Sequence, residues 1–544
     1  MDKYRYRRYI DETGFENRFA DEKEIKKVLS HINYSQPVAG PNKGGMPFIS
    51  DAKSAWVDNA DYHTLILGST GSMKTRVLIL PTIFTLGFAG ENMVISDPKG
   101  ELFEKSSGYL KSQGYKINVI NLRDMEKSDS WNPFAESYKS FHAGKVDEAK
   151  SDMMDFVETL FSDMKATSKD MFWPLSSIQL ANGLSELMLR LSKNPDECNP
   201  ASMAGMINHI VARGGEHETS YESLGTEIAN KLEEGTSLHA NLSPTLSMSA
   251  KLTLDGIKSN TTTGFDAFTK STQLMALSSN TTFNLHDFAK PNEKHVVYLI
   301  TPDENTKYHF FAATFVRQLY TLMIRDSAAL PGQALPNRLN FVLDEFANFP
   351  RIDNMQTMIT AARSRNIRFY LVVQSNNQLK AVYNKDAETI KTNCLNWIYL
   401  STKEDELIKQ VMKMTGNIDD NAPLISYQKL SSFKKVDSRE HPDKAGAEAL
   451  ILISRERPYV SFLPDVSRYK AFVDYPPAEY PKLKEDFSFF SLRKRLFRAG
   501  YPSSELRALL NENPTPDGKG EKKEEKIAGD SFNDILDKLA GRKS

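Results

Sequence analysis

Leu65–Val77 has the sequence LILGSTGSMKTRV, an apolar stretch followed by a Gly- and Ser-rich loop and then by residues compatible with a helix. Phosphate binding at a helix N-terminus needs inward-facing backbone N–H groups, a Lys for the β- and γ-phosphates and a hydroxyl for Mg²⁺. Lys74 and Thr75 suit the last two roles. The loop departs from the pattern G-x-x-x-x-G-K-[ST] at Met73, where a φ above zero would cost about 1–2 kcal/mol. A plain turn between strand and helix remains the alternative.

A second stretch, Asn340–Glu345 (NFVLDE), has an apolar strand pattern that ends in two adjacent carboxylates. In proteins with a phosphate-binding loop, an Asp at the end of a neighbouring strand helps to hold Mg²⁺, and a following Glu can orient and deprotonate the attacking water. Asp344 and Glu345 suit these roles. Such a strand end also arises by chance, but its occurrence after Lys74 and Thr75 favours the functional interpretation.

The next predicted strand is flanked by further polar candidates. Gln374 ends this strand, and it could sit between the two carboxylates and the terminal phosphate or simply cap the strand. Upstream, Ala362–Arg368 (ARSRNIR) contains three arginines. They could form a solvated helix end or supply an arginine finger to a neighbouring subunit's nucleotide, and spacing alone does not decide. Asp97–Glu101 (DPKGE) follows an earlier strand at the ligand-binding end of the predicted sheet, although it could be only a turn.

Short apolar runs without alternation predict strands buried on both faces of a mostly parallel sheet. Seven such runs begin at His63, Asn92, Lys116, His295, Leu339, Ile367 and Asn396. Helix-length segments separate them, which is an α/β pattern. Apolar residues recur every three or four positions over 143–165 and 174–192, which predicts amphipathic helices.

We therefore expect a discontinuous sheet domain over 56–136 and 281–500, interrupted by an all-helical insertion over 137–280. Residues 1–55 mix charge, Pro and Gly and are expected to form an N-terminal extension that could serve as a docking segment. Residues 501–544 contain a charged linker and end in an amphipathic peptide from Ser531, a candidate partner-binding segment.

The composition sets limits on partners and location. The 544 residues contain 69 Lys plus Arg and 70 Asp plus Glu, so any site for a polyanion such as DNA must be local. Arg493, Lys494, Arg495 and Arg498 form one local candidate, or a solvated helix face. Two cysteines exclude a disulfide framework and suit a reducing compartment. The longest apolar run is shorter than the roughly 18–20 residues of a membrane helix.

These motifs together resemble the TraG/VirD-type family of type IV secretion coupling proteins. The resemblance rests on the loop at 68–75 and on DPKGE (97–101), WNPF (131–134), LDEFAN (343–348) and QSNNQL (374–379), which occur in family order. It covers most of residues 60–420. It implies a RecA-like P-loop ATPase, often hexameric, with an all-α domain inserted between Walker A and Walker B. Members deliver relaxase-bound DNA, and in some systems protein effectors, to a secretion channel.

Residue by residue, the resemblance implies the following roles. Walker A consists of Gly68, Ser69, Thr70, Gly71, Ser72, Met73, Lys74 and Thr75. Asp344 with Thr75 would hold Mg²⁺, and Glu345 would be the catalytic carboxylate for ATP hydrolysis. Gln374 takes the sensor position. Arg363 best matches the trans-acting finger, with Arg365 as a competitor. The inserted helices are implied to face the cytoplasmic mouth of the ring and to recognise substrate.

Two departures from the family pattern bear on these expectations. Most members begin with transmembrane helices, and none is visible here, so we expect either a small membrane-anchoring partner or a soluble branch of the family. The expected location is the cytoplasm, peripheral at the membrane, with relaxase, DNA and secretion-channel subunits as partners. The second departure is Met73, which makes rapid hydrolysis less certain. A receptor platform with weak hydrolysis and a septal-translocase or HerA-like DNA motor remain as alternatives to the conjugative ATPase.

Overall fold

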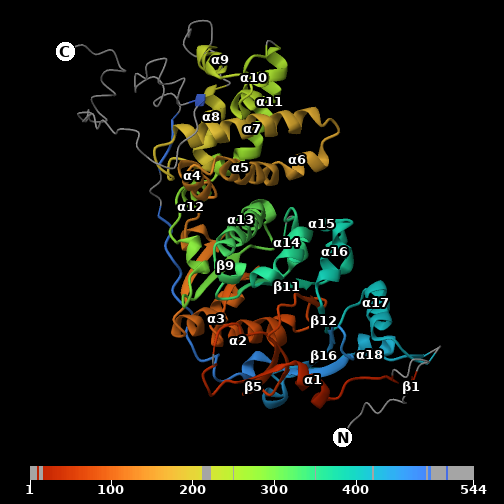
Figure 1. Cartoon of the computed structure of the whole chain (residues 1–544). Helices are drawn as coiled ribbons and strands as arrows, with labels where there is room; N and C mark the ends of the chain where they lie inside the picture. The colour runs from red at the N-terminus through yellow and green to blue at the C-terminus, as the bar shows by residue number, and fades with distance from the viewer. Residues whose placement is uncertain are drawn as a thin grey trace.

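A ten-stranded sheet organises the larger part of the molecule (Figure 1). The computed structural model describes residues 9–10, 16–38, 40–210, 222–248, 250–349, 351–419, 422–484, 488–491 and 510–511. The strands of this sheet are β6 (Thr64–Leu67), β7 (Asn92–Ser96), β8 (Lys116–Asn121), β9 (His295–Ile300), β10 (Leu339–Leu343), β11 (Ile367–Val373), β12 (Asn396–Tyr399), β15 (Lys435–Val436), β16 (Gly446–Ile453) and β17 (Tyr459–Pro464).

The seven predicted apolar runs are strands β6 to β12, and they form the parallel part of the sheet. Their spatial order is β12–β6–β11–β10–β7–β9–β8, and β16 pairs antiparallel with β12 at the far side. Every residue of β7, β9, β10 and β11 is buried, whereas β8 at the edge is partly exposed. This burial on both faces explains the absence of alternation in the sequence.

Helices cover the two faces of the sheet (Figure 1). The helices of this layer are α2 (Leu80–Phe88) and α3 (Glu101–Ser112) on one face, and α13 (His309–Ala328), α14 (Met355–Ala361), α15 (Asn376–Tyr383) and α16 (Asp386–Asn393) on the other. The chain then adds α17 (Asp405–Thr415), α18 (Tyr427–Ser431) and the short pair β13 (Asn417–Asp419) and β14 (Ala422–Pro423) beside the sheet. Each face thus has its own hydrophobic core. The predicted α/β architecture is confirmed.

Every regular element described between residues 137 and 280 is a helix, and these helices form a separate layer beyond α13 (Figure 1). They are α4 (Ala135–His142), α5 (Val146–Leu160), α6 (Ser162–Thr167), α7 (Phe172–Leu191), α8 (Pro200–Ile210), α9 (Glu222–Lys231), α10 (Ser237–Leu246), α11 (Lys251–Lys270) and α12 (Thr272–Leu277). Their apolar side chains join the core on the α13 side of the sheet. The predicted helical insertion is therefore packed against the sheet domain.

The described part of residues 1–55 does not stand apart from the sheet domain as the expected extension would. It contains β1 (Tyr9–Ile10), β2 (Glu16–Asn17), α1 (Glu22–Val28), β3 (Ser30–Asn33), β4 (Met46–Ser50) and the start of β5 (Ser54–Asp58). Ile25, Phe48 and Val57 are buried in the same core as α2. Their burial depends on contacts with residues distant in sequence, so the local composition gave no sign of it.

Beyond Tyr469 the chain leaves the sheet and runs along one side of the molecule toward the helical insertion (Figure 1). Ala478 N–H donates to Ser107 Oγ at 2.9 Å, and Phe490 N–H donates to Ser202 Oγ at 2.9 Å on α8. The predicted basic cluster at 493–498 and the peptide from Ser531 lie outside the described residues. Among the residues that are described, no helix is long and apolar enough to cross a membrane.

Candidate functional site

The loop that follows β6 is anchored by neighbouring strands. Gly68 N–H donates to Val373 O at 3.2 Å, and Ser69 N–H donates to Ser401 O at 2.8 Å. A Cβ at Gly68 would lie 2.6 Å from Ser72 Oγ, so a larger residue there would require the Ser72 side chain to shift. The first helical turn begins at Thr75, with Lys74 just before it.

Met73 has φ +68°, in the left-handed region where the second glycine of the pattern would be unstrained. The cost to Met is about 1–2 kcal/mol. Its carbonyl accepts from the N–H groups of Arg76 and Val77, both at 3.0 Å, which starts the helix. Its half-buried side chain packs against the α2 core, so burial offsets part of the strain.

The Lys74 side chain is buried and folds back over its own loop. Its ammonium donates to Gly68 O at 2.5 Å and to Ser69 O at 3.3 Å. Burial lowers the pKa of Lys74, and the negative charges of Asp344 and Glu345 oppose that shift. Among the described residues this cation is hydrogen-bonded to neutral carbonyls, so it is available to phosphate oxygens.

The two predicted carboxylates follow directly after β10. Ser96 Oγ donates to the Asp344 backbone carbonyl at 2.7 Å, and Glu345 N–H donates to Asp344 Oδ1 at 2.9 Å. Burial raises the pKa of Asp344 to about 7, and the adjacent Glu345 charge adds to the shift while Lys74 opposes it. Glu345 has φ +52°, which turns the chain away from the strand direction.

Gln374, at the end of β11, connects the loop to the second carboxylate. Thr70 Oγ1 donates to Gln374 Oε1 at 2.9 Å, and Gln374 Nε2 donates to Glu345 Oε1 at 2.6 Å. The other oxygen of Glu345 accepts a hydrogen bond from Asn348 Nδ2. The Glu345 carboxylate is therefore oriented by two amide groups.

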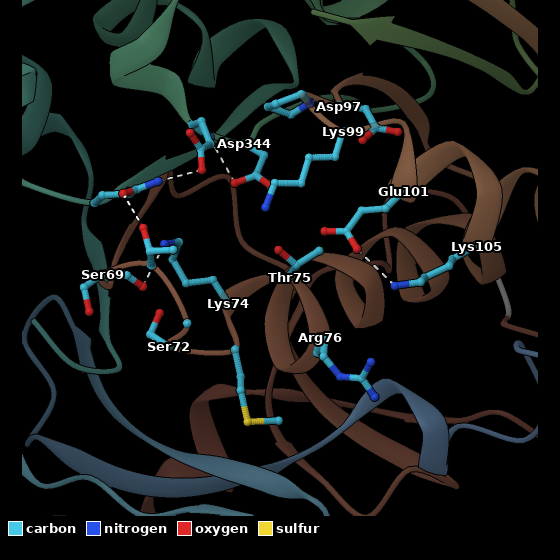
Figure 2. A pocket seen from close by; sticks show the side chains of 16 residues that line it. Ser69, Ser72, Lys74, Thr75, Arg76, Asp97, Lys99, Glu101, Lys105 and Asp344 are labelled. Carbon is cyan, nitrogen blue, oxygen red and sulfur yellow. Dashed lines mark hydrogen bonds and ion pairs between the residues drawn. The ribbon is translucent and has the colours of Figure 1, made fainter. Parts of the chain in front are cut away.

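The sheet order brings these residues together. Strands β6, β11 and β10 are adjacent and parallel, so the residues at their carboxyl ends meet at one edge, where α/β proteins bind ligands. Figure 2 shows Lys74, Thr75 and Asp344 converging on the same space. They line a cavity of about 260 Å³, together with Glu345 and Gln374.

The opposite wall of the cavity contains residues to which the sequence assigned no role. They are Arg76, Asp97, Lys99, Glu101 and Lys105. The sequence signal that could have identified these residues was the position of DPKGE directly after β7, because β7 pairs with β10 in the sheet. Burial raises the pKa of Asp97 to about 6. Lys105 lies one helical turn from Glu101 and pairs with it at 3.1 Å.

The oxygen atoms at this edge are suited to a magnesium ion. Mg²⁺ prefers carboxylate and hydroxyl oxygens together with phosphate. Thr75 offers a hydroxyl, and Asp344 offers a carboxylate whose charged form burial disfavours. A divalent cation would stabilise that charged form, so the residues present fit the ion.

The three arginines near β11 have different environments. Arg363 and Arg365 precede the seven-residue strand β11, roughly 20 Å from its other end at about 3.3 Å per residue. Neither is among the described residues that line the cavity. Arg363 pairs with Asp61 at 3.3 Å, and Arg365 donates to Gln333 O at 2.9 Å.

Arg368 fits neither interpretation offered by the sequence. It is 1% exposed, which excludes a solvated helix end, and it cannot reach a neighbouring subunit. Its guanidinium donates to Ala60 O at 2.9 Å and to Gly44 O at 3.2 Å, and it pairs with Glu91 at 3.3 Å. Arg368 thus ties the N-terminal segment to the sheet.

The sequence model of the family described as "Type IV secretory system Conjugative DNA transfer" matches residues 18–446. The chain belongs to this family. Among curated relatives, it is 22% identical over 484 residues to Protein VirD4 of Rhizobium radiobacter, covering 86% of this chain and 64% of that protein. It is 23% identical over 367 residues to the conjugal transfer protein TraG of Escherichia coli, covering 65% of this chain and 55% of that protein. The chain therefore spans less than two thirds of these relatives.

The fold resembles that of the plasmid coupling protein TrwB, solved in complex with the non-hydrolysable GTP analogue GDPNP. The TM-score is 0.57 at 15% identity, and the match covers 86% of this chain and 98% of that one. This similarity confirms the predicted α/β fold with an inserted all-α domain.

Proposed function

We propose that this chain is an ATP-hydrolysing coupling protein of a conjugative type IV secretion system. One observation carries the proposal: Lys74, Asp344 and Glu345 line a single cavity although they are distant in sequence. Membership of the conjugative DNA transfer family supports it, and so does the nucleotide analogue named for the TrwB structure.

In the proposed mechanism, Lys74 exchanges the carbonyls of its own loop for oxygens of the β- and γ-phosphates. Thr75 and Asp344 would hold a magnesium ion, which would supply positive charge to offset the charge on the phosphates. Glu345, oriented by Gln374 and by Asn348, deprotonates the attacking water.

The arginine finger that stabilises the transferred phosphoryl group is proposed to come from a second copy of the chain. Arg363 precedes β11 and the cavity lies at the other end of that strand, so Arg363 suits the site of a neighbouring subunit better than its own. This geometry favours a homo-oligomeric ring, a hexamer when active, with sites at the subunit boundaries. Arg365 remains the competing candidate.

The proposed substrate is relaxase-bound DNA, delivered to subunits of the secretion channel. The family description supports DNA transfer as the process. With a net charge of −1, the chain must contact DNA through a local patch or the ring lumen, and this contact should weaken steeply with salt. The family match does not favour a septal translocase.

The decisive variant is Glu345→Gln, which keeps the size and shape of the side chain but replaces one acceptor oxygen by an NH2 donor and removes the basic carboxylate. We expect Mg²⁺–ATP binding close to parental and turnover reduced by about 100-fold or more, because the base is lost. Calorimetric binding and phosphate release, with and without DNA, are the measurements.

Equal turnover in Glu345→Gln and parent would remove the hydrolytic mechanism. A parent that binds nucleotide but shows no turnover, even with DNA, would support the static receptor platform instead. The strained φ of Met73 is the observation that motivates this second candidate.

A further inference from the structure

The turn Asp97–Gly100 forms a wall of the cavity that the mechanism above leaves without a role. It follows β7, which pairs with β10, so it borders the Asp344 side of the site. Figure 2 shows the Lys99 side chain extending from this turn into the cavity toward Asp344.

The backbone of this turn is held in place by the protein itself. Asp97 is fully buried, and its Oδ2 accepts from Phe103 N–H at 2.8 Å, which caps the start of α3. Gly100 has φ +76°, a conformation that strains other residues. Arg123 donates to Pro98 O at 2.9 Å and to Lys99 O at 3.0 Å. The position from which the Lys99 side chain extends is therefore set before any ligand binds.

The cations that line the cavity differ in what they contact. Lys74 donates to carbonyls of its own loop, Arg76 pairs with Asp465 at 2.6 Å, and Lys105 pairs with Glu101 at 3.1 Å. Within the part of the chain that the structure describes, the Lys99 ammonium has neither a hydrogen bond nor an ion pair. Its charge is thus available to a ligand.

One further feature indicates an anionic ligand beside Lys99. Lys99 and Lys74 line the same cavity, so an anion bound between their ammonium groups would offset the repulsion between the two positive charges.

We propose that Lys99 is a second phosphate-contacting lysine, which meets the terminal phosphate from the side opposite Lys74 and so selects a nucleoside triphosphate over a diphosphate. This inference rests on the proposed nucleotide site. Lys99 extends toward Asp344, next to the carboxylate that activates water, and the terminal phosphate belongs on that side. The β-phosphate lies deeper in the Lys74 loop, so a diphosphate gains little from Lys99.

The test compares binding of a non-hydrolysable ATP analogue and of ADP, each with Mg²⁺, to the full chain by calorimetry. In Lys99→Ala the analogue should bind about 10- to 100-fold more weakly, the range for a lost charge-assisted hydrogen bond, whereas ADP should change less than about twofold. Lys99→Arg should retain most of the affinity for the analogue. Lys111→Ala is the matched control, because Lys111 is exposed in the last turn of α3 and is not among the described residues that line the cavity, and it should leave both affinities within about twofold.

The outcomes separate this inference from the proposed function. If the parent binds the analogue and Lys99→Ala binds it equally well, the role of Lys99 is wrong and the nucleotide site stands. Equal losses for analogue and ADP, or equal losses in Lys99→Ala and Lys111→Ala, would also overturn it, since they indicate a general charge effect. If the parent binds neither nucleotide, both proposals fail. Lys99 is exposed, so circular dichroism should show an unchanged fold in its variants.

Discussion

The side-chain amide of Gln374 donates to Glu345 at 2.6 Å while its oxygen accepts from Thr70 at 2.9 Å. One residue at the end of β11 therefore links the loop proposed to bind phosphate to the carboxylate proposed as the base. A change in the loop on phosphate binding would reach Glu345 through this amide.

Gln374→Ala should affect ATP turnover and nucleotide affinity differently. Without the amide, Glu345 keeps only the hydrogen bond from Asn348, so we expect turnover to fall about tenfold or more while nucleotide affinity changes little. Phosphate release and calorimetry measure the two quantities. Gln410→Ala, on α17 away from the cavity, is the control and should behave as the parent. A parallel loss of affinity in Gln374→Ala would indicate that Gln374 binds nucleotide rather than orienting Glu345.

Substitutions at Met73 isolate the backbone strain of the loop. Met73→Ala and Met73→Gly both lose the half-buried side chain, but only glycine relieves the positive φ. Met73→Gly should therefore be more stable than Met73→Ala by about 1 kcal/mol in urea unfolding. If Met73→Ala is the more stable of the two, the strain assigned to this position is wrong. Faster turnover in Met73→Gly than in the parent would also show that the strain limits hydrolysis.

A mixing experiment tests whether sites are shared between subunits. Arg363→Ala and Glu345→Gln should each be inactive alone. Mixed in equal amounts, they should recover up to about a quarter of parental turnover, because random assembly pairs an intact Glu345 with an intact Arg363 at one boundary in four. Arg365→Ala should keep turnover if Arg363 is the finger. No recovery on mixing, with assembly verified by light scattering, would argue against a finger acting in trans.

His286 should make stability depend on pH. Its Nδ1 faces Asp326 at 2.7 Å and its Nε2 faces Glu136 at 3.1 Å, and these hydrogen bonds, with that to Asp326 the larger, raise the pKa of His286 to about 10. Lys139, at 2.7 Å from Glu136, shares that carboxylate. Because the folded pKa lies above the ordinary value of 6.5, the stabilisation is complete below about pH 6.5 and is lost as the pH rises toward 10.

The measurement for this prediction is the melting temperature of the parent and of His286→Gln across that pH range. The difference between them should be largest near the acidic end and should shrink toward about pH 10. The site is half-exposed, which limits the size of the effect. A difference that stays constant with pH would show that His286 contributes through packing alone.

Strands β6 to β12 could be predicted because burial on both faces produces a local sequence pattern, a short run of apolar residues without alternation. The helices of the insertion could also be predicted locally, from apolar residues that recur every three or four positions. The N-terminal strands and Arg368 could not be predicted, because Phe48 is buried and Arg368 is hydrogen-bonded only through contacts with segments distant in sequence. Local composition carries no information about such partners.

The sequence by itself determined the candidates for catalysis: Lys74, Asp344, Glu345 and Gln374 each follow or precede a recognisable strand. Only the tertiary structure decided that Gln374 lies between Thr70 and Glu345, that Met73 has a positive φ, and that Lys99 enters the same cavity from β7. The physical reason is the strand order. Neighbours in a parallel sheet are set by crossover packing of helices onto its faces, and this packing depends on contacts that no single segment contains.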